Sequence, residues 1–310
     1  KIEKNLSFYF EYIKQSFTNP ELFNIFKNNK RILYFLIQNK IIIVDEYIAQ
    51  LIFKKDDKND DVISNYFVPN PRFFKPKRST TRNYRYYFFV EIKQFLEEQN
   101  QIEIERELFQ RCQQFSIDYE KNRQKGENES YVCELIRQDL VKEFIINFNK
   151  NKFSLSDEVK ESIFETNPLL MKKRATLIEY AAFYGSIQIF QYLKFNGIEL
   201  TPSLWLYAIH SNNPKIIHLL EENNIKPEDQ TYFKCLKESI KCHHNNIANY
   251  ILTNLIDQKI EINEKNFNEN QFAFGFHYHN YEFIQNFNNF QFIFYYACLY
   301  DYFSIVKLLL

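Results

Sequence analysis

The stretch of residues 176–193 constrains the fold of this chain more than any other part of the sequence. It places Ala181 and Ala182 in a short helical pattern, interrupts that pattern at Gly185, and resumes it with apolar residues at helical spacing. Glycine readily adopts the left-handed backbone conformation with which helices commonly end. The stretch therefore predicts two short helices joined by a tight turn. A unit of this size buries its apolar face by stacking on similar units, an arrangement typical of binding proteins.

The small residue of this unit recurs further along the chain. Ala208, Ser239 and Ala297 follow Ala181 at successive intervals of 27, 31 and 58 residues, and each precedes an apolar helical pattern. A small side chain at one fixed position lets neighbouring helices approach closely. The sequence therefore predicts an array of helix–turn–helix repeats, of which the clearest are residues 174–200, 201–230, 231–262 and 291–310.

The residue at the turn gives a second regularity. Gly185, Asn212, His243 and Asp301 occupy the corresponding place in the four repeats. Glycine takes the left-handed conformation freely, asparagine tolerates it, and histidine and aspartate tolerate it less well. We expect a left-handed turn residue at each of these four positions.

Two of these segments resemble the ankyrin-repeat family. Residues 176–182, Thr-Leu-Ile-Glu-Tyr-Ala-Ala, resemble the inner-helix signature Thr-Pro-Leu-His-x-Ala-Ala, and residues 305–310 resemble the outer helix of that family. Leu177 and Glu179 depart from the signature, which has proline and histidine there. Residues 126–251 also resemble a large group of Phe-, Tyr- and Asn-rich protist ankyrin proteins that carry an uncharacterised domain. The resemblance implies an all-α solenoid and no enzymatic activity.

We expect two domains, an N-terminal helical domain over residues 1–125 and a degenerate ankyrin-type array over residues 126–310. A polar segment that contains Gly126 marks the boundary. Residues 133–146 have a helix–turn–helix rhythm that predicts an atypical terminal unit, and residues 279–284 predict a decayed turn and outer helix. Because the apolar pattern still runs at the last residues, we expect the array to be truncated there.

Composition excludes several classes of protein. Lys plus Arg and Asp plus Glu both number 39, so the formal net charge of zero gives no general attraction to nucleic acid or anionic membranes. The five cysteines have no tight spacing, which predicts reduced thiols in an intracellular, cytoplasmic or nuclear, protein rather than a disulfide framework. No apolar run approaches the roughly 18 residues that a membrane-spanning helix needs. We expect a monomer.

Sequence patterns of catalytic and metal sites are missing. The chain has no Gly-x-Ser-x-Gly, no His-Glu-x-x-His and no glycine-rich phosphate loop, so we expect neither an enzyme nor a cofactor. Cys235, Cys242, His243 and His244 fall in one repeat, but the two cysteines are seven residues apart and adjacent histidines point in different directions. We therefore expect core thiols and turn residues there, and no metal.

The resemblance offers one candidate binding surface. In an ankyrin-like stack the two residues before each turn project from the concave face. The residues at these places are Phe183, Tyr184, His210, Ser211, Lys241, Cys242, Leu299 and Tyr300. Aromatic and polar side chains side by side are typical of binding hot spots, so we expect an unidentified protein partner to bind here. The open alternative is that Phe183 or Leu299 packs against the N-terminal domain.

Residues 72–90 form a second candidate surface. From Arg72 to Val90 there are six basic residues and no acidic one, and aromatic residues interleave with the last charges. Basic groups neutralise phosphates and aromatic rings stack on bases, so a nucleic-acid-associated module is the alternative function. The neutral net charge and an acidic loop nearby favour instead a basic loop that leads into an aromatic core helix.

Overall fold

The computed structural model describes residues 10–54, 84–98, 106, 118–151, 154–256, 273–284, 290–300 and 302–310. These residues are predominantly helical, and the β pairing among them is an isolated bridge between Glu158 and Thr176. The all-α prediction is therefore confirmed. The predicted turn at Asp301 and most of the basic segment, residues 72–83, lie outside the described residues.

The chain divides into two compact units. The first unit comprises residues 1–130 and 160–174, and the second comprises residues 131–159 and 175–310. The predicted domain boundary follows residue 125, so the structure groups two segments of the predicted array, 126–130 and 160–174, with the N-terminal unit. Such a return of the chain leaves no pattern in the sequence, because residues 160–174 contain no repeat of their own.

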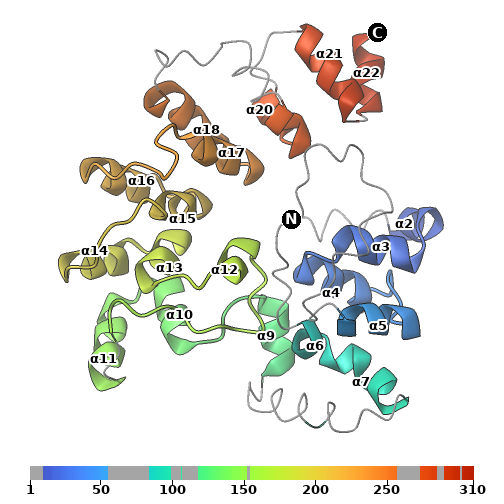
Figure 1. Cartoon of the computed structure of the whole chain (residues 1–310), viewed down its shortest axis with the longest axis horizontal. Helices are drawn as coiled ribbons and strands as arrows, with labels where there is room; N and C mark the ends of the chain where they lie inside the picture. Colours follow the sequence, from blue (N-terminus) through green and yellow to red (C-terminus); the bar gives the residue numbers. More distant parts are fainter. Residues whose placement is uncertain are drawn as a thin grey trace. The chain divides into compact units, whose positions relative to one another are not determined.

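The first unit is built from short helices. They are α2 (Phe10–Ser16), α3 (Asn19–Phe26), α4 (Lys30–Gln38), α5 (Glu46–Lys54), α6 (Tyr84–Tyr87), α7 (Phe89–Glu98), α9 (Tyr119–Lys125) and α12 (Pro168–Lys172) (Figure 1). Helix α3 packs on α4 and α5, and α5 packs on α6 and α7. The aromatic residues Tyr84, Tyr87 and Phe88 are at most 1% exposed and form part of the core between these helices.

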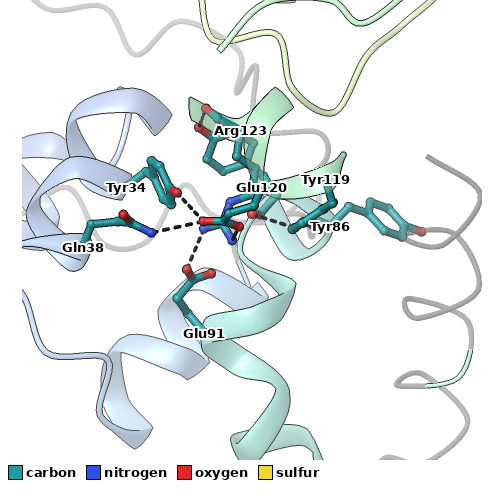
Figure 2. A network of polar contacts seen from close by, with 8 residues as sticks. Tyr34, Gln38, Tyr86, Glu91, Tyr119, Glu120 and Arg123 are labelled. Atoms are coloured by element: carbon teal, nitrogen blue, oxygen red, sulfur yellow. Dashed lines mark hydrogen bonds and ion pairs between the residues drawn. The ribbon is translucent and has the colours of Figure 1, made fainter. Parts of the chain in front are cut away.

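A buried arginine organises the polar interior of this unit. The Arg123 side chain is fully buried, and its Nη2 lies 2.6 Å from Glu91 Oε1 while its Nη1 lies 3.3 Å from Glu120 Oε2 (Figure 2). Its guanidinium also lies 4.3 Å from the ring centroid of Tyr34, whose hydroxyl donates to Glu120. A buried charge needs such partners because leaving water is costly. The network therefore ties α4, α7 and α9 together.

The second unit consists of helix pairs. They are α10 (Tyr131–Arg137) with α11 (Val141–Asn151), α13 (Leu177–Tyr184) with α14 (Ile187–Phe195), α15 (Leu204–Ser211) with α16 (Pro214–Glu222), and α17 (Phe233–Lys241) with α18 (Asn245–Tyr250) and η1 (Ile251–Leu255) (Figure 1). The first helices pack on one another in chain order, α10 on α13, α13 on α15 and α15 on α17, and α11 packs on α14. Helices α20 (Tyr281–Ile284), α21 (Phe290–Leu299) and α22 (Phe303–Leu309) follow, and α21 packs on α22.

The turns of these pairs share one backbone conformation. Gly185, Asn212 and His243 have φ values of 72°, 51° and 58°, as predicted. Asp139 and His279 have φ values of 52° and 54° at the corresponding places, so the pairs that begin near residues 131 and 273 use the same turn. The weaker patterns at residues 133–146 and 279–284 thus contain the helices and turns that were predicted for them.

The small residues also behave as predicted. Ala181, Ala208, Ser239 and Ala297 are fully buried. The corresponding residue of the pair formed by 273–277 and α20 is Gly275, where a built Cβ would lie 2.7 Å from Ile284 Cγ1. That distance is shorter than real Cβ contacts allow. Close packing therefore sets an upper limit on side-chain size at Gly275. The α10–α11 pair differs, since the buried Leu135 occupies this position there.

Candidate partner-binding surface

Hydrogen bonds between consecutive helix pairs hold the candidate surface in place. The residue after each turn donates from its side chain to a carbonyl oxygen of the preceding pair: Ser186 to Ile136, His244 Nδ1 to Ile209 at 2.8 Å, Asn280 Nδ2 to Ile240 at 2.9 Å, and the Tyr302 hydroxyl to Phe276 at 2.7 Å. Asn213 is the variant of this pattern and donates to Gly185 at 3.1 Å. Four of the donors thus reach the carbonyl three residues before the preceding turn residue, whereas Asn213 reaches the turn residue itself.

Four of the eight predicted surface residues come together in this register. The ring of Phe183 stacks on that of His210, with centroids 5.1 Å apart and planes inclined by 22°. The Sγ atom of Cys242 lies 3.7 Å from His210 Nδ1. Lys241 Nζ and His210 Nε2 lie 2.6 Å and 3.0 Å from the same oxygen, Oε1 of Glu238. We call Phe183, His210, Glu238, Lys241 and Cys242 the central cluster.

Glu238 is the member of the central cluster that sequence reasoning missed. It lies one helical turn before Lys241 and Cys242 on α17, so i,i+3 and i,i+4 spacing places it on the same face. Burial raises the pKa of its carboxyl, but hydrogen bonds from His210 and Lys241 outweigh burial and lower the pKa to about 2. The carboxylate is therefore ionised at neutral pH and holds two donors from two helix pairs.

The thiol of Cys242 is protonated at neutral pH. Burial raises its pKa to about 12, and the charge of Glu238 acts in the same direction. A thiol in this state is a poor nucleophile, because the thiolate is the reactive form. In the free protein Cys242 is therefore a neutral thiol beside the His210 ring.

The other predicted residues take different places. Tyr184 lies beside the central cluster, with its ring centroid 4.9 Å from that of Phe183. The hydroxyl of Ser211 donates to the Ala208 carbonyl at 2.6 Å and accepts from the Asn213 amide, so it serves the turn. Leu299 is 37% exposed, and the ring of Tyr300 contacts that of His277 at 5.8 Å. The predicted surface thus has a central part on three pairs and a further part at the end of α21.

Most aromatic residues in the described part of the basic and aromatic segment are buried. Tyr84, Tyr87 and Phe88 are buried, and the Tyr84 hydroxyl donates to the Lys27 carbonyl at 2.6 Å. Arg85 Nε donates to the Phe53 carbonyl at 2.6 Å while its guanidinium covers the Phe53 ring. These three aromatic faces are unavailable for stacking on bases. Helices α6 and α7 therefore contain the aromatic core residues that we expected to follow the basic loop.

Comparisons with known proteins found no match to this chain among family models, curated proteins or solved structures. Within the part of the chain that the structure describes, no helix combines the length and the apolar character needed to cross a membrane. The geometry of its own residues therefore carries the functional conclusion.

Proposed function

We propose that this chain is a non-catalytic protein-binding scaffold of the ankyrin-repeat type, and that its partner binds at Phe183, Tyr184, His210, Lys241 and Cys242. One observation carries the proposal: side chains from three consecutive helix pairs, α13–α14, α15–α16 and α17–α18, meet at one place while remaining partly exposed. An aromatic ring, an imidazole and an ammonium group side by side suit a mixed apolar and acidic epitope.

Order within the central cluster supports binding. Phe183 stacks on His210, and Glu238 holds His210 and Lys241, so the exposed groups are already positioned before a partner arrives. Binding then loses less side-chain entropy than it would with freely rotating groups. Consecutive inter-pair hydrogen bonds extend this order to the backbone beneath the cluster.

The ankyrin-type assignment rests on the resemblance of residues 176–182 and 305–310 together with local geometry. Short helix pairs, a left-handed residue at the turns after α13, α15 and α17, and a buried small residue in each of these three helices suit a repeat array. In such an array neighbouring repeats supply a continuous surface rather than a deep cavity. That geometry favours recognition of a macromolecule.

The experiment is a capture of partners from lysate of the native cell with two matched double variants. Phe183→Ala/His210→Ala removes an aromatic ring and an imidazole from the central cluster. Phe195→Ala/His218→Ala removes the same two groups from α14 and α16, where Phe195 is 90% exposed and the His218 side chain is 55% exposed. Circular dichroism first establishes that both variants fold like the wild type.

We expect a partner that the wild type and the Phe195/His218 variant retain and the Phe183/His210 variant loses. Truncating hot-spot residues costs about 2 kcal/mol or more each, so the loss should exceed tenfold in the amount captured. A partner retained equally by both variants would overturn the proposed surface and direct attention to the N-terminal unit.

A further inference from the structure

Three potential metal ligands of different chemistry converge in the central cluster. One nitrogen of His210, one carboxylate oxygen of Glu238 and the sulfur of Cys242 all lie within 4.8 Å of one another. The residues come from two helix pairs, since His210 lies in the last turn of α15 while Glu238 and Cys242 lie at the end of α17. We propose that His210, Glu238 and Cys242 bind one Zn²⁺ ion and leave its fourth position open to water.

The spacing of the three groups suits a single small ion. Zinc binds nitrogen, oxygen and sulfur ligands at about 2.0–2.3 Å in a tetrahedral arrangement, which separates neighbouring ligand atoms by roughly 3.3–3.7 Å. His210 Nε2 lies 3.0 Å from Glu238 Oε1 and 3.8 Å from Cys242 Sγ. These two separations differ from those of a tetrahedral zinc site by only about 0.3 Å, and the remaining one, from Glu238 to Cys242, is at most 4.8 Å.

The ligand types select zinc over the commoner divalent cations. Calcium and magnesium bind sets of oxygen ligands, whereas a thiolate together with an imidazole favours zinc. Three protein ligands and one open position are the pattern of zinc sites that bind an exchangeable fourth ligand. Phe183 stacks on the His210 ring and limits its rotation, which helps to keep the imidazole directed at the site.

Lys241 and the thiol proton oppose metal binding and give the site distinctive properties. Lys241 Nζ donates to Glu238 Oε1 at 2.6 Å, so zinc must share the carboxylate with an ammonium group. Glu238 has a second oxygen with which it can do so. Zinc must also displace the proton of Cys242, so binding releases a proton and strengthens as the pH rises.

The test is a titration of the purified full chain with Co²⁺, followed by displacement with Zn²⁺. Cobalt bound to a thiolate gives a charge-transfer absorption in the near ultraviolet, which reports sulfur ligation directly. Cys242→Ser should abolish that absorption, and Cys298→Ser, which removes an exposed thiol, should leave it unchanged. His210→Ala and Glu238→Gln should each weaken Co²⁺ binding by at least about tenfold, because even outer-shell partners contribute that much.

Two further variants test the cation environment. His218→Ala removes a second histidine that contacts a carboxylate, Glu221, at 3.1 Å, and should leave Co²⁺ affinity unchanged. Lys241→Met removes the competing ammonium group and should raise the affinity. The proposal is overturned if the wild type shows no charge-transfer absorption, if Cys242→Ser retains it, or if Cys298→Ser abolishes it.

The titration uses the isolated chain and the metal alone. Its result is therefore independent of the proposed protein partner: capture of a partner can fail while zinc binds, and the reverse can also hold.

Discussion

The Nδ1 atom of His244 lies 2.8 Å from the carbonyl oxygen of Ile209, and this hydrogen bond joins the turn after α17 to the helix pair before it. Equivalent bonds from Ser186, Asn280 and Tyr302 make the contact a recurring element of the second unit. The repeating structure is thus held by polar contacts at the turns as well as by the apolar helix faces.

His244→Phe should destabilise the protein by about 1–2 kcal/mol. The phenyl ring keeps the bulk of the imidazole but cannot donate, so the Ile209 carbonyl loses the shorter of its two hydrogen bonds and keeps the one from the Asn212 amide at 3.2 Å. Urea unfolding followed by circular dichroism measures the change. His218→Phe is the matched control, because that histidine is exposed on α16 and should shift the midpoint little. Equal effects of the two substitutions would contradict the importance of the inter-pair bond.

The stability of the metal-free chain should decrease as the pH falls below 6.5, the ordinary pKa of histidine. Burial lowers the pKa of His244, His210 and His243 lower it further, and the bond to Ile209 opposes the shift. Because the folded pKa lies below the unfolded value of 6.5, the unfolded chain binds more protons in this range. The contribution of His244 to stability is therefore fully present above pH 6.5 and is lost as the pH falls through the pKa of His244 in the folded chain.

Comparison of urea midpoints at about pH 7.5 and about pH 5.5 measures this decrease. His244→Phe removes the titrating group, so the variant should show a smaller difference between the two pH values than the wild type. Burial also lowers the pKa of His277, which should leave part of the decrease in the variant. An unchanged difference would show that His244 does not contribute.

Gly275→Ala should destabilise the pair formed by residues 273–277 and α20 by roughly 1–3 kcal/mol, as overpacking does. The new Cβ would meet Ile284 Cγ1 at 2.7 Å, and Ile284 is itself buried. Adding Ile284→Ala removes the obstructing atoms, so the alanine at 275 should then cost little. Thermal unfolding of the four combinations measures the coupling. Additive effects would mean that the two side chains do not collide.

The helix pairs could be predicted because their determinants are local. A left-handed turn residue and a small residue four positions before it recur as Ala181 with Gly185, Ala208 with Asn212, and Ser239 with His243. Gly275 and His279 follow the same rule. The sequence did not identify Gly275 as the equivalent of Ala181, because the intervals between repeats vary and glycine replaces alanine there. Local backbone requirements thus survive where the overall similarity between repeats has decayed.

The central cluster could be predicted only in part. Phe183, His210, Lys241 and Cys242 followed from their places before the turns. Their contacts with Glu238 depend on the lateral offset between α15 and α17, which hydrogen bonds such as His244 to Ile209 fix. An offset of this kind leaves no pattern within a single helix. For the same reason the neighbourhood of His210 and Cys242, 32 residues apart, was not visible in the sequence.

Removing the buried arginine of the first unit should be among the most destabilising single changes in the described residues. Arg123→Met leaves Glu91, whose side chain is 13% exposed, without the cation that lies 2.6 Å away. Breaking a buried ion pair on one side costs about 3–5 kcal/mol because the remaining charge is uncompensated. Glu120 keeps its hydration, since its side chain is 49% exposed.

The double variant Arg123→Met/Glu91→Leu should recover most of that loss, because it removes both charges and fills the space with apolar atoms. Urea unfolding of the wild type, both single variants and the double variant gives the coupling energy. Should Arg123→Met not fold, recovery of a folded double variant still reports the penalty of an unpaired Glu91. A double variant as unstable as Arg123→Met would show instead that the guanidinium acts through its contacts with rings such as Tyr34, at 4.3 Å.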